Sequence, residues 1–219
     1  MNAAHHYPVL ERTREITQTD DLDILELRTA LGIPLANDMR RWLGKQPAMR
    51  RLCLDFRSVR AVTLSVAEEV GPVLMQVIQQ TDALDHRYPV YALNTPEPAY
   101  TFARAFANVN WTGLAALPKP GEFNDSFLTV AEDERVAWVV MGDISGQMAA
   151  ILALAERRFQ AGDSLTSEDL KELDFMAEVG PAARSKRLTE LYSRRLLAFR
   201  ENPQKPRERL FLPAWRLPP

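Results

Sequence analysis

The sequence predicts an α/β protein in two parts, with an α/β domain over residues 1–118 and an α+β domain over residues 119–219. Three observations carry this prediction. Over roughly the first 110 residues, short strand patterns alternate with helical patterns, which is typical of a sheet covered by helices. In the last third, three helical patterns precede a short basic hairpin. Between them, LPKPGEFNDS at 117–126 is rich in turn formers and predicts a linker.

The first part can be followed element by element. An apolar-rich stretch at 22–31 could begin as a strand, and Pro34 then opens a helix that Gly44 ends. Apolar periodicity predicts a second helix over 66–78, in which Pro72 should cause a kink or a fresh helix start. Strands are expected at 52–56 and 89–93, and a further helix at 96–106, giving a sheet of about four strands.

The second part begins with two strand-like runs, 127–131 and 136–141, separated as in a hairpin. A helical pattern follows over 147–160. A second helix is expected from Leu165, where Thr166 and Asp169 have the spacing of a capping box. Gly180-Pro181 opens a third helix with Leu188, Leu191 and Tyr192 on its inner face. Two short strands, 196–200 and 207–212, then flank a loop.

The distribution of charge divides the chain more sharply than its mean does. The formal net charge is −2, which on its face argues against a nucleic-acid partner. Residues 180–219, however, hold ten basic and three acidic side chains, a balance of +7, which leaves −9 for residues 1–179. This asymmetry predicts an anion-seeking surface at the C-terminal end.

The stretch 164–212 contains the pattern of helix, turn, helix and basic hairpin, in which Ser185-Lys186-Arg187-Leu188, Leu191 and Leu196-Leu197 match the recognition-helix motif. In this order and spacing it resembles the winged helix-turn-helix family. The resemblance implies that the third helix is a recognition helix for the major groove of duplex DNA, and that the hairpin is a wing on backbone or minor groove.

Helical geometry agrees with that implication. With the leucines directed inward, Ala182, Ala183, Lys186, Arg187 and Arg194 fall on the outer face. Small residues in the first turn let a helix approach base edges, while the cations can donate to phosphate or guanine. Lys205, Arg207 and Arg209 can hold phosphates in the wing. An ordinary solvated helix face and turn would explain the same charges, and winged helices also bind proteins.

The segments RLCLDFRSVRAVTLSVAEEV (51–70) and YPVYALNTPEPAYTFARAFANV (88–109) are similar to STAS-like domains of bacterial partner-switching systems. The resemblance implies a domain that binds protein partners, sometimes under serine phosphorylation. Asp55, Ser58 and Val59 match the start of the family's loop, and Ser65 is the surviving hydroxyl at the phosphorylated end. Ser65 also begins a capping box with Glu68, which explains a serine there without phosphorylation.

The sequence nominates no catalytic residue, cofactor or metal site. Neither of the glycine-rich phosphate-binding motifs, G-x-x-x-x-G-K-[ST] and G-x-G-x-x-G, occurs in the sequence. The possible metal ligands do not have the spacing of a metal site with an acidic partner on one element: His5, His6, His86 and Cys53. His5-His6 is expected in a mobile tail, and Cys53 as a buried, inert thiol within a strand. Trp111 and Trp215 have no periodic assignment and are candidates for a partner interface. The single cysteine and the lack of a long apolar run suggest a cytoplasmic location away from membranes.

These observations lead to one preferred hypothesis and one alternative. The preferred hypothesis is a bacterial, non-enzymatic transcriptional regulator that binds duplex DNA, with the STAS-like part as a sensor, partner-binding or dimerisation module. In the alternative, the protein is an adaptor of a partner-switching or assembly system, and its winged helix binds protein.

Overall fold

The computed structural model describes residues 5–19, 23–119 and 127–219. The chain divides into two compact units: unit 1 is Met1–Asp143 with Pro218–Pro219, and unit 2 is Ile144–Leu217. Both combine helices with strands, so the expectation of a mixed α/β protein is confirmed at that level.

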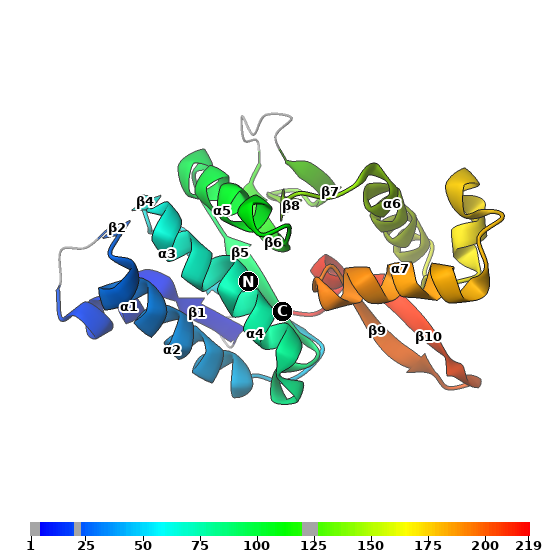
Figure 1. Ribbon diagram of the computed structural model, residues 1–219, viewed down its shortest axis with the longest axis horizontal. Helices are drawn as coiled ribbons and strands as arrows, with labels where there is room; N and C mark the ends of the chain where they lie inside the picture. Colours follow the sequence, from blue (N-terminus) through cyan, green and yellow to red (C-terminus); the bar gives the residue numbers. More distant parts are fainter. Residues whose placement is uncertain (1–4, 20–22, 120–126) are drawn as a thin grey trace. The chain divides into compact units, whose positions relative to one another are not determined.

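Unit 1 is built on a sheet with the strand order β1-β3-β5-β6-β8-β7 (Figure 1). The first four strands in this order run parallel, and the last two continue it antiparallel. The strands are β1 (His6–Pro8), β3 (Arg50–Asp55), β5 (Arg87–Ala92), β6 (Thr112–Pro118), β7 (Leu128–Glu132) and β8 (Val136–Gly142). Two further short strands, β2 (Ile24–Leu25) and β4 (Ala61–Val62), pair with each other in parallel.

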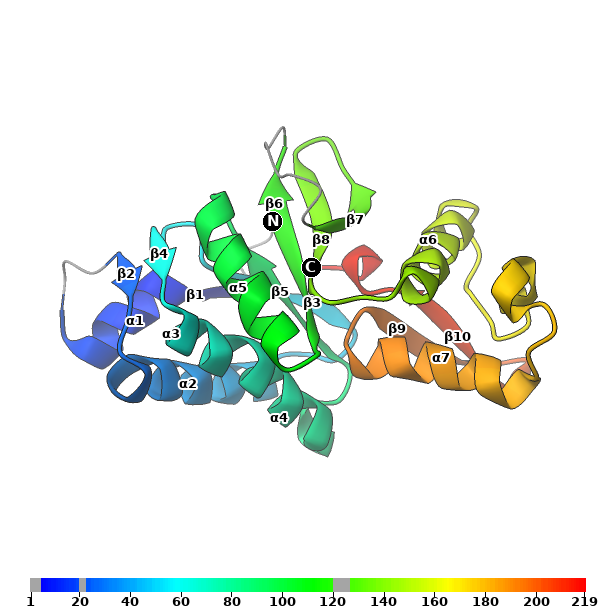
Figure 2. The ribbon, with the colours of Figure 1, turned by 45° about the horizontal axis from the view of Figure 1, so that its top comes forward.

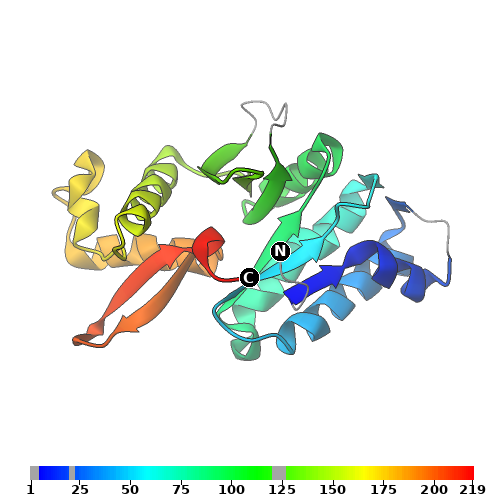
Figure 3. The same cartoon turned by 180° about the vertical axis from the view of Figure 1, so that it is seen from behind.

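Helices connect the parallel strands, as the alternating patterns predict. They are α1 (Val9–Thr17), α2 (Ile33–Gly44), α3 (Leu64–Glu68), α4 (Leu74–Gln80) and α5 (Pro96–Asn108), with π-helical turns η2 (Arg28–Gly32) and η3 (Glu69–Val73) and a 3₁₀ turn η4 (Asp82–Leu84). Figures 1 and 3 show α2 to α5 on one face of the sheet. Pro72 lies inside η3, and regular α-helix resumes at Leu74, because proline cannot donate to the helical ladder.

The core of unit 1 lies between these helices and the sheet. Phe102 of α5 packs against Phe56 and Tyr91, with ring centroids 5.0 and 5.1 Å away. The buried Tyr91 hydroxyl donates to the Val70 carbonyl over 2.8 Å. A Cβ atom on Gly113 would lie 2.5 Å from the ring of Phe106, so the close approach of α5 to β6 requires glycine at this position.

The boundary between the units differs from the one predicted. The runs at 127–131 and 136–141 do form an antiparallel pair, β7 and β8, but β8 pairs with β6 along its whole length and so belongs to unit 1. The division therefore falls after residue 143 instead of residue 118. The strand β6 was not predicted, because Thr112–Pro118 is buried on both faces and lacks alternation. Most of the predicted linker, 120–126, lies outside the described residues.

The expectation of a mobile tail at His5-His6 is wrong. His6 belongs to β1 and stands opposite Cys53 of β3 in a parallel register. Tyr7 and Val9 are buried and anchor β1 and the start of α1. Three residues carry too little periodicity to predict a strand, and the adjacent polar helix has only two buried residues, so neither element was visible in the sequence.

Unit 2 contains two α-helices and a hairpin, whereas the sequence predicts three helices before the hairpin. Its elements are α6 (Gly146–Gln160), the 3₁₀ turns η5 (Asp169–Glu172) and η6 (Asp174–Met176), α7 (Pro181–Ser193), β9 (Leu197–Asn202), β10 (Lys205–Pro213) and the 3₁₀ turn η7 (Ala214–Arg216). Figure 2 shows the β9–β10 hairpin beside α7. Leu165 adds an isolated bridge to Phe211 of β10, so the hairpin gains a short third partner.

The helix expected from Leu165 is replaced by 3₁₀ turns. The Thr166 amide and hydroxyl both donate to Asp169 Oδ2 over 2.7 Å, which is one half of the predicted capping box. Thr166 is not the N-cap, because η5 begins at Asp169 and its N-cap is Glu168. Leu165 and Leu170 are both buried. The segment nonetheless breaks at Leu173, whose extended backbone separates η5 from η6. The predicted helix start at Thr166 is therefore wrong, and the segment contains two short 3₁₀ turns in place of an α-helix.

A buried carboxylate holds the end of unit 2 together. Glu156 of α6 is 7% exposed and accepts hydrogen bonds from the Trp215 indole over 2.8 Å and from Arg216 Nε over 3.0 Å. Burial opposes ionisation of Glu156, but the hydrogen bonds from Arg216 and Trp215 outweigh it and lower its pKa. Trp215 is therefore a core residue of unit 2, and the expectation that it serves a partner interface is wrong.

Candidate nucleic-acid interface

The outer face of α7 carries the residues predicted to approach DNA. Arg184, Leu188 and Leu191 are buried at helical spacing, and this fixes which side of α7 faces solvent. The residues exposed there include Ala182, Ala183, Ser185, Lys186 and Arg187. Pro181 occupies the first helical position, where its missing N–H costs nothing. The first two turns of α7 therefore present small side chains followed by two cations.

Not every cation counted in the basic segment is available. Arg184 is 2% exposed, and its guanidinium donates to the Val179 carbonyl and to Glu168 Oε1, the latter over 2.8 Å. Arg195 is 3% exposed, with its guanidinium 5.1 Å from the centre of the Tyr192 ring. Arg216 is bound to Glu156. The surface charge of this segment is therefore smaller than the sequence balance of +7.

Glu190 reduces the free charge of α7 further. Its carboxylate lies 3.3 Å from Arg187 Nη1 and 3.6 Å from Arg194 Nη2. Arg194 is largely buried, with a side chain 12% exposed, so it contributes less to the outer face than helical geometry predicts. Lys186 makes no ion pair with any residue that the structure describes. Of the predicted cations on α7, Lys186 is thus the most available and Arg187 is shared.

The β9–β10 hairpin carries a second group of cations, and one of them packs over an aromatic side chain. The Arg209 guanidinium lies 4.4 Å from the centre of the Phe199 ring, and the Phe199 ring contacts Tyr192 edge-to-face at 4.8 Å. Lys205 is exposed and lies 3.8 Å from Glu208, while the side chain of Arg207 is outside the described part of the structure. Sequence reasoning missed Phe199, although its position opposite Phe211 in the hairpin follows from the strand register.

Ser65 lies inside helix α3 and does not cap its start, contrary to the prediction from the sequence. Thr63 is the N-cap of α3, and the helix begins at Leu64, so the proposed capping box starting at Ser65 does not form. The Ser65 hydroxyl lies 3.3 Å from the Thr63 hydroxyl and is half-buried. The backbone here continues from the β4 strand, and this sets the helix start two residues earlier than the serine suggests.

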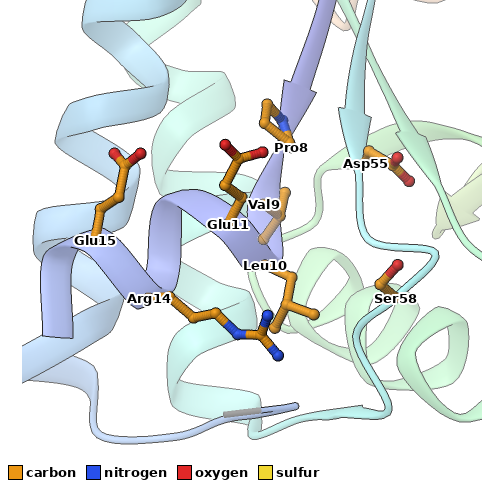
Figure 4. Close-up of a pocket in the computed structure, with 8 residues that line it drawn as sticks. All are labelled: Pro8, Val9, Leu10, Glu11, Arg14, Glu15, Asp55 and Ser58. Atoms are coloured by element: carbon orange, nitrogen blue, oxygen red, sulfur yellow. The ribbon is translucent and has the colours of Figure 1, made fainter. Parts of the chain in front are cut away.

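A hollow of about 620 Å³ opens where β1 and β3 end (Figure 4). Its lining combines apolar and charged side chains: Pro8, Val9, Leu10, Glu11, Arg14, Glu15, Asp55 and Ser58. Asp55 accepts two hydrogen bonds of 2.8 Å from the Arg57 guanidinium and lies 3.4 Å from His6 Nε2. Burial opposes ionisation of Asp55, but the bonds from Arg57 dominate and lower its pKa. Asp55 and Ser58, which carry the STAS-like resemblance, thus border one hollow.

Cys53 is buried, as predicted, and burial raises the pKa of its thiol to about 12, which keeps it protonated. Within the described residues, His, Cys, Asp and Glu side chains do not gather in threes around a possible metal position. None of the helices in the described ranges has the length and apolar character needed to cross a bilayer.

Protein-family models, curated proteins and solved structures were compared with the chain, and none gave a significant match.

Proposed function

We propose that unit 2 binds duplex DNA as a winged helix, with α7 as the recognition helix and the β9–β10 hairpin as the wing. The observation that carries this proposal is the outer face of α7, where exposed Ala182 and Ala183 precede Lys186 and Arg187. Small side chains let the helix backbone approach base edges, and the cations that follow can bind phosphate or guanine.

The order of elements supports the same proposal. A helix, a short bridging residue, two helical turns, a second long helix and an antiparallel hairpin follow one another in unit 2. In a winged helix the hairpin contacts the DNA backbone or minor groove, and here its exposed Arg200, Lys205 and Arg209 would do so. Each phosphate neutralised in this way releases counterions, which favours binding at low salt.

The proposed role of the whole chain is transcriptional regulation, with unit 1 as the sensor, partner-binding or dimerisation module. The hollow bordered by α1, Asp55 and Ser58 supports a recognition role for unit 1. Dimerisation would present two copies of α7 to half-sites about one helical turn apart.

Fluorescence anisotropy on a labelled duplex tests the proposal with the full-length chain. We expect Lys186→Ala/Arg187→Ala to weaken binding by roughly tenfold or more, because two contacts to the duplex are lost. Arg40→Ala/Arg104→Ala is the matched control, since both residues are exposed in unit 1 and the change in net charge is the same. The control should bind as the unmodified protein does.

Equal affinities for the two double variants would contradict a specific role for α7. If the unmodified chain failed to bind duplex at micromolar concentration in low salt, DNA binding would be excluded, and a protein-binding role of unit 2 would become the leading hypothesis.

A further inference from the structure

A second hollow in unit 1, of about 270 Å³, lies between the start of α1 and the C-terminal half of α2. Its walls are formed by two aromatic residues, three cations and one carboxylate: Tyr7, Trp42, Arg12, Arg41, Lys45 and Asp38. The lining charge is therefore +2, in a unit whose sequence is acidic overall. This excess of positive charge around one open hollow needs a physical explanation.

Asp38 fixes the geometry of the hollow. Its Oδ2 atom accepts from the Tyr7 hydroxyl over 2.7 Å and from Arg12 Nε and Nη2 over 3.0 and 2.9 Å, and its Oδ1 atom accepts from Arg41 Nη2 over 3.2 Å. Burial opposes ionisation, but the bonds from Tyr7 and Arg12 lower the pKa of Asp38, so the carboxylate stays charged. Both oxygens of Asp38 are occupied, and Arg12 is bound to Glu15 as well.

Two cations keep free donors in this arrangement. Arg41 uses only Nη2 toward Asp38, and its side chain is 68% exposed. Lys45 follows the last residue of α2 and forms no ion pair with the residues described. These two residues are four apart and lie on the same side of the helix, where like charges repel. A bound anion would remove that repulsion and satisfy the free donors.

The C-terminal dipole of α2 alone does not explain this pair. It would favour a cation anywhere in the last turns of the helix. Arg40, the neighbour of Arg41, is also exposed, but it lines a different hollow with Ile33 and Val73. Arg12, Arg41 and Lys45 differ from Arg40 because all three line the same hollow of about 270 Å³.

The aromatic wall defines the rest of the ligand. The Trp42 ring is half-buried and meets the buried Tyr7 ring edge-to-face, with centroids 5.4 Å apart. We propose that this hollow, defined by Tyr7, Trp42, Arg41 and Lys45, binds a small oxyanion, a carboxylate or phosphate carried on a compact and partly apolar body. The volume is near the lower end for small-molecule sites, so the ligand is small.

The test uses the Trp42 indole N–H as a local probe in ¹H–¹⁵N NMR spectra of the full-length protein. The chain has four tryptophans, and Trp42→Phe identifies the signal. Benzoate and inorganic phosphate are titrated separately at constant ionic strength, and benzylamine serves as the cationic counterpart of benzoate. We expect a saturable shift of the Trp42 signal with at least one of the two anions and none with benzylamine. Benzoate as the tighter ligand would indicate a carboxylate on a ring, and phosphate as the tighter ligand would indicate a phosphoryl group.

Charge variants decide whether the hollow is the site. Arg41→Ala and Lys45→Ala should each weaken binding of the effective anion by about fivefold or more, because each removes a charged donor. Arg40→Ala should leave the affinity unchanged. All three positions are exposed, so the fold should persist, and circular dichroism verifies this. Shifts that stay linear up to high anion concentration, or equal affinities in all three variants, would overturn the proposal whatever unit 2 binds.

Discussion

At the scale of single residues, the packing of unit 2 involves a few buried charged side chains. Arg184 shows how easily such a residue is misassigned: in the sequence it counts among the cations of a basic segment, yet it is buried and bound to Glu168. Its spacing from Leu188 and Leu191 places it on the inner face of α7, and this was the available signal. The position of Arg184 relative to the buried leucines therefore predicted its burial better than its charge did.

Glu156 gives a direct prediction about stability. Glu156→Gln should lower the free energy of unfolding of unit 2 by about 1–3 kcal/mol, because charge-assisted hydrogen bonds to Arg216 and Trp215 are weakened in a buried place. Glu172→Gln, at a residue half exposed and bound to Arg158, should cost less than about 0.5 kcal/mol. Hydrogen exchange of α6 amides at increasing urea measures both. Equal losses for the two variants would refute the anchoring role of Glu156.

The carboxylates with lowered pKa values predict how the stability of the protein falls at acidic pH. Asp38, Asp55 and Glu156 all have folded-state pKa values below their ordinary ones. Their ion pairs therefore contribute fully above the unfolded pKa of about 4, and the contribution is lost as pH falls through the folded values. The melting temperature should be nearly constant from pH 6 to 5 and should fall below about pH 4. Asp38→Asn/Glu156→Gln should flatten that fall, and an equally steep fall in the variant would contradict the assignment.

At the scale of elements, long periodic segments were predictable and short or fully buried ones were not. The helices α2, α5, α6 and α7 follow apolar periodicity and proline positions, and their bounds lie close to the predicted ones. β1 is too short to show a pattern, and β6 is apolar on both faces. At 169–176 the spacing of a capping box did not lead to an α-helix, and two separate 3₁₀ turns bury Leu170 and Met176 instead.

The recognition role of α7 makes a prediction that separates binding from folding. Ala183→Glu places a carboxylate in the first turn of α7, where it favours the helix by up to about 0.5 kcal/mol. The same carboxylate should repel a phosphate backbone and weaken duplex binding by roughly tenfold or more. Thermal unfolding and fluorescence anisotropy measure the two effects.

The matched control for this change is Ala48→Glu, at an exposed alanine in unit 1. It adds the same charge to unit 1 and leaves the sequence of α7 unchanged. Equal affinities of Ala183→Glu and Ala48→Glu for duplex would show that the first turn of α7 does not face the DNA.

At the scale of the whole molecule, the separation of basic and acidic residues along the chain was predictable. The number of basic side chains that are exposed at the surface was only partly predictable. The basic excess at residues 180–219 falls within unit 2 apart from the last two residues, whereas the acidic excess lies in the rest of the chain. Three of the ten cations are buried or bound in the interior, and Glu190 holds two more. Side-chain pairing of this kind depends on tertiary contacts, so composition alone overestimates the available charge.

The division of the chain illustrates the same limit. Strand patterns at 127–141 were correctly located, but their partner could not be read from local sequence because β6 itself was missed. The hairpin was therefore placed in the wrong unit. In unit 1, an antiparallel pair of strands extends a series of parallel strands. Such pairing depends on strands that are distant in the sequence, so it cannot be predicted from one segment alone.

The central claim is that exposed cations of α7 and the hairpin neutralise DNA phosphates, and the salt dependence of duplex binding tests it most directly. Among the side chains that the structure describes there, five cations are exposed: Lys186, Arg187, Arg200, Lys205 and Arg209. If most of them contact phosphate, the logarithm of the binding constant should fall against the logarithm of salt concentration with a slope of about −3 to −5. Lys186→Ala/Arg187→Ala should reduce the magnitude of that slope by about 2, and Arg40→Ala/Arg104→Ala should leave it unchanged. A slope near zero, or the same slope in both double variants, would contradict the claim.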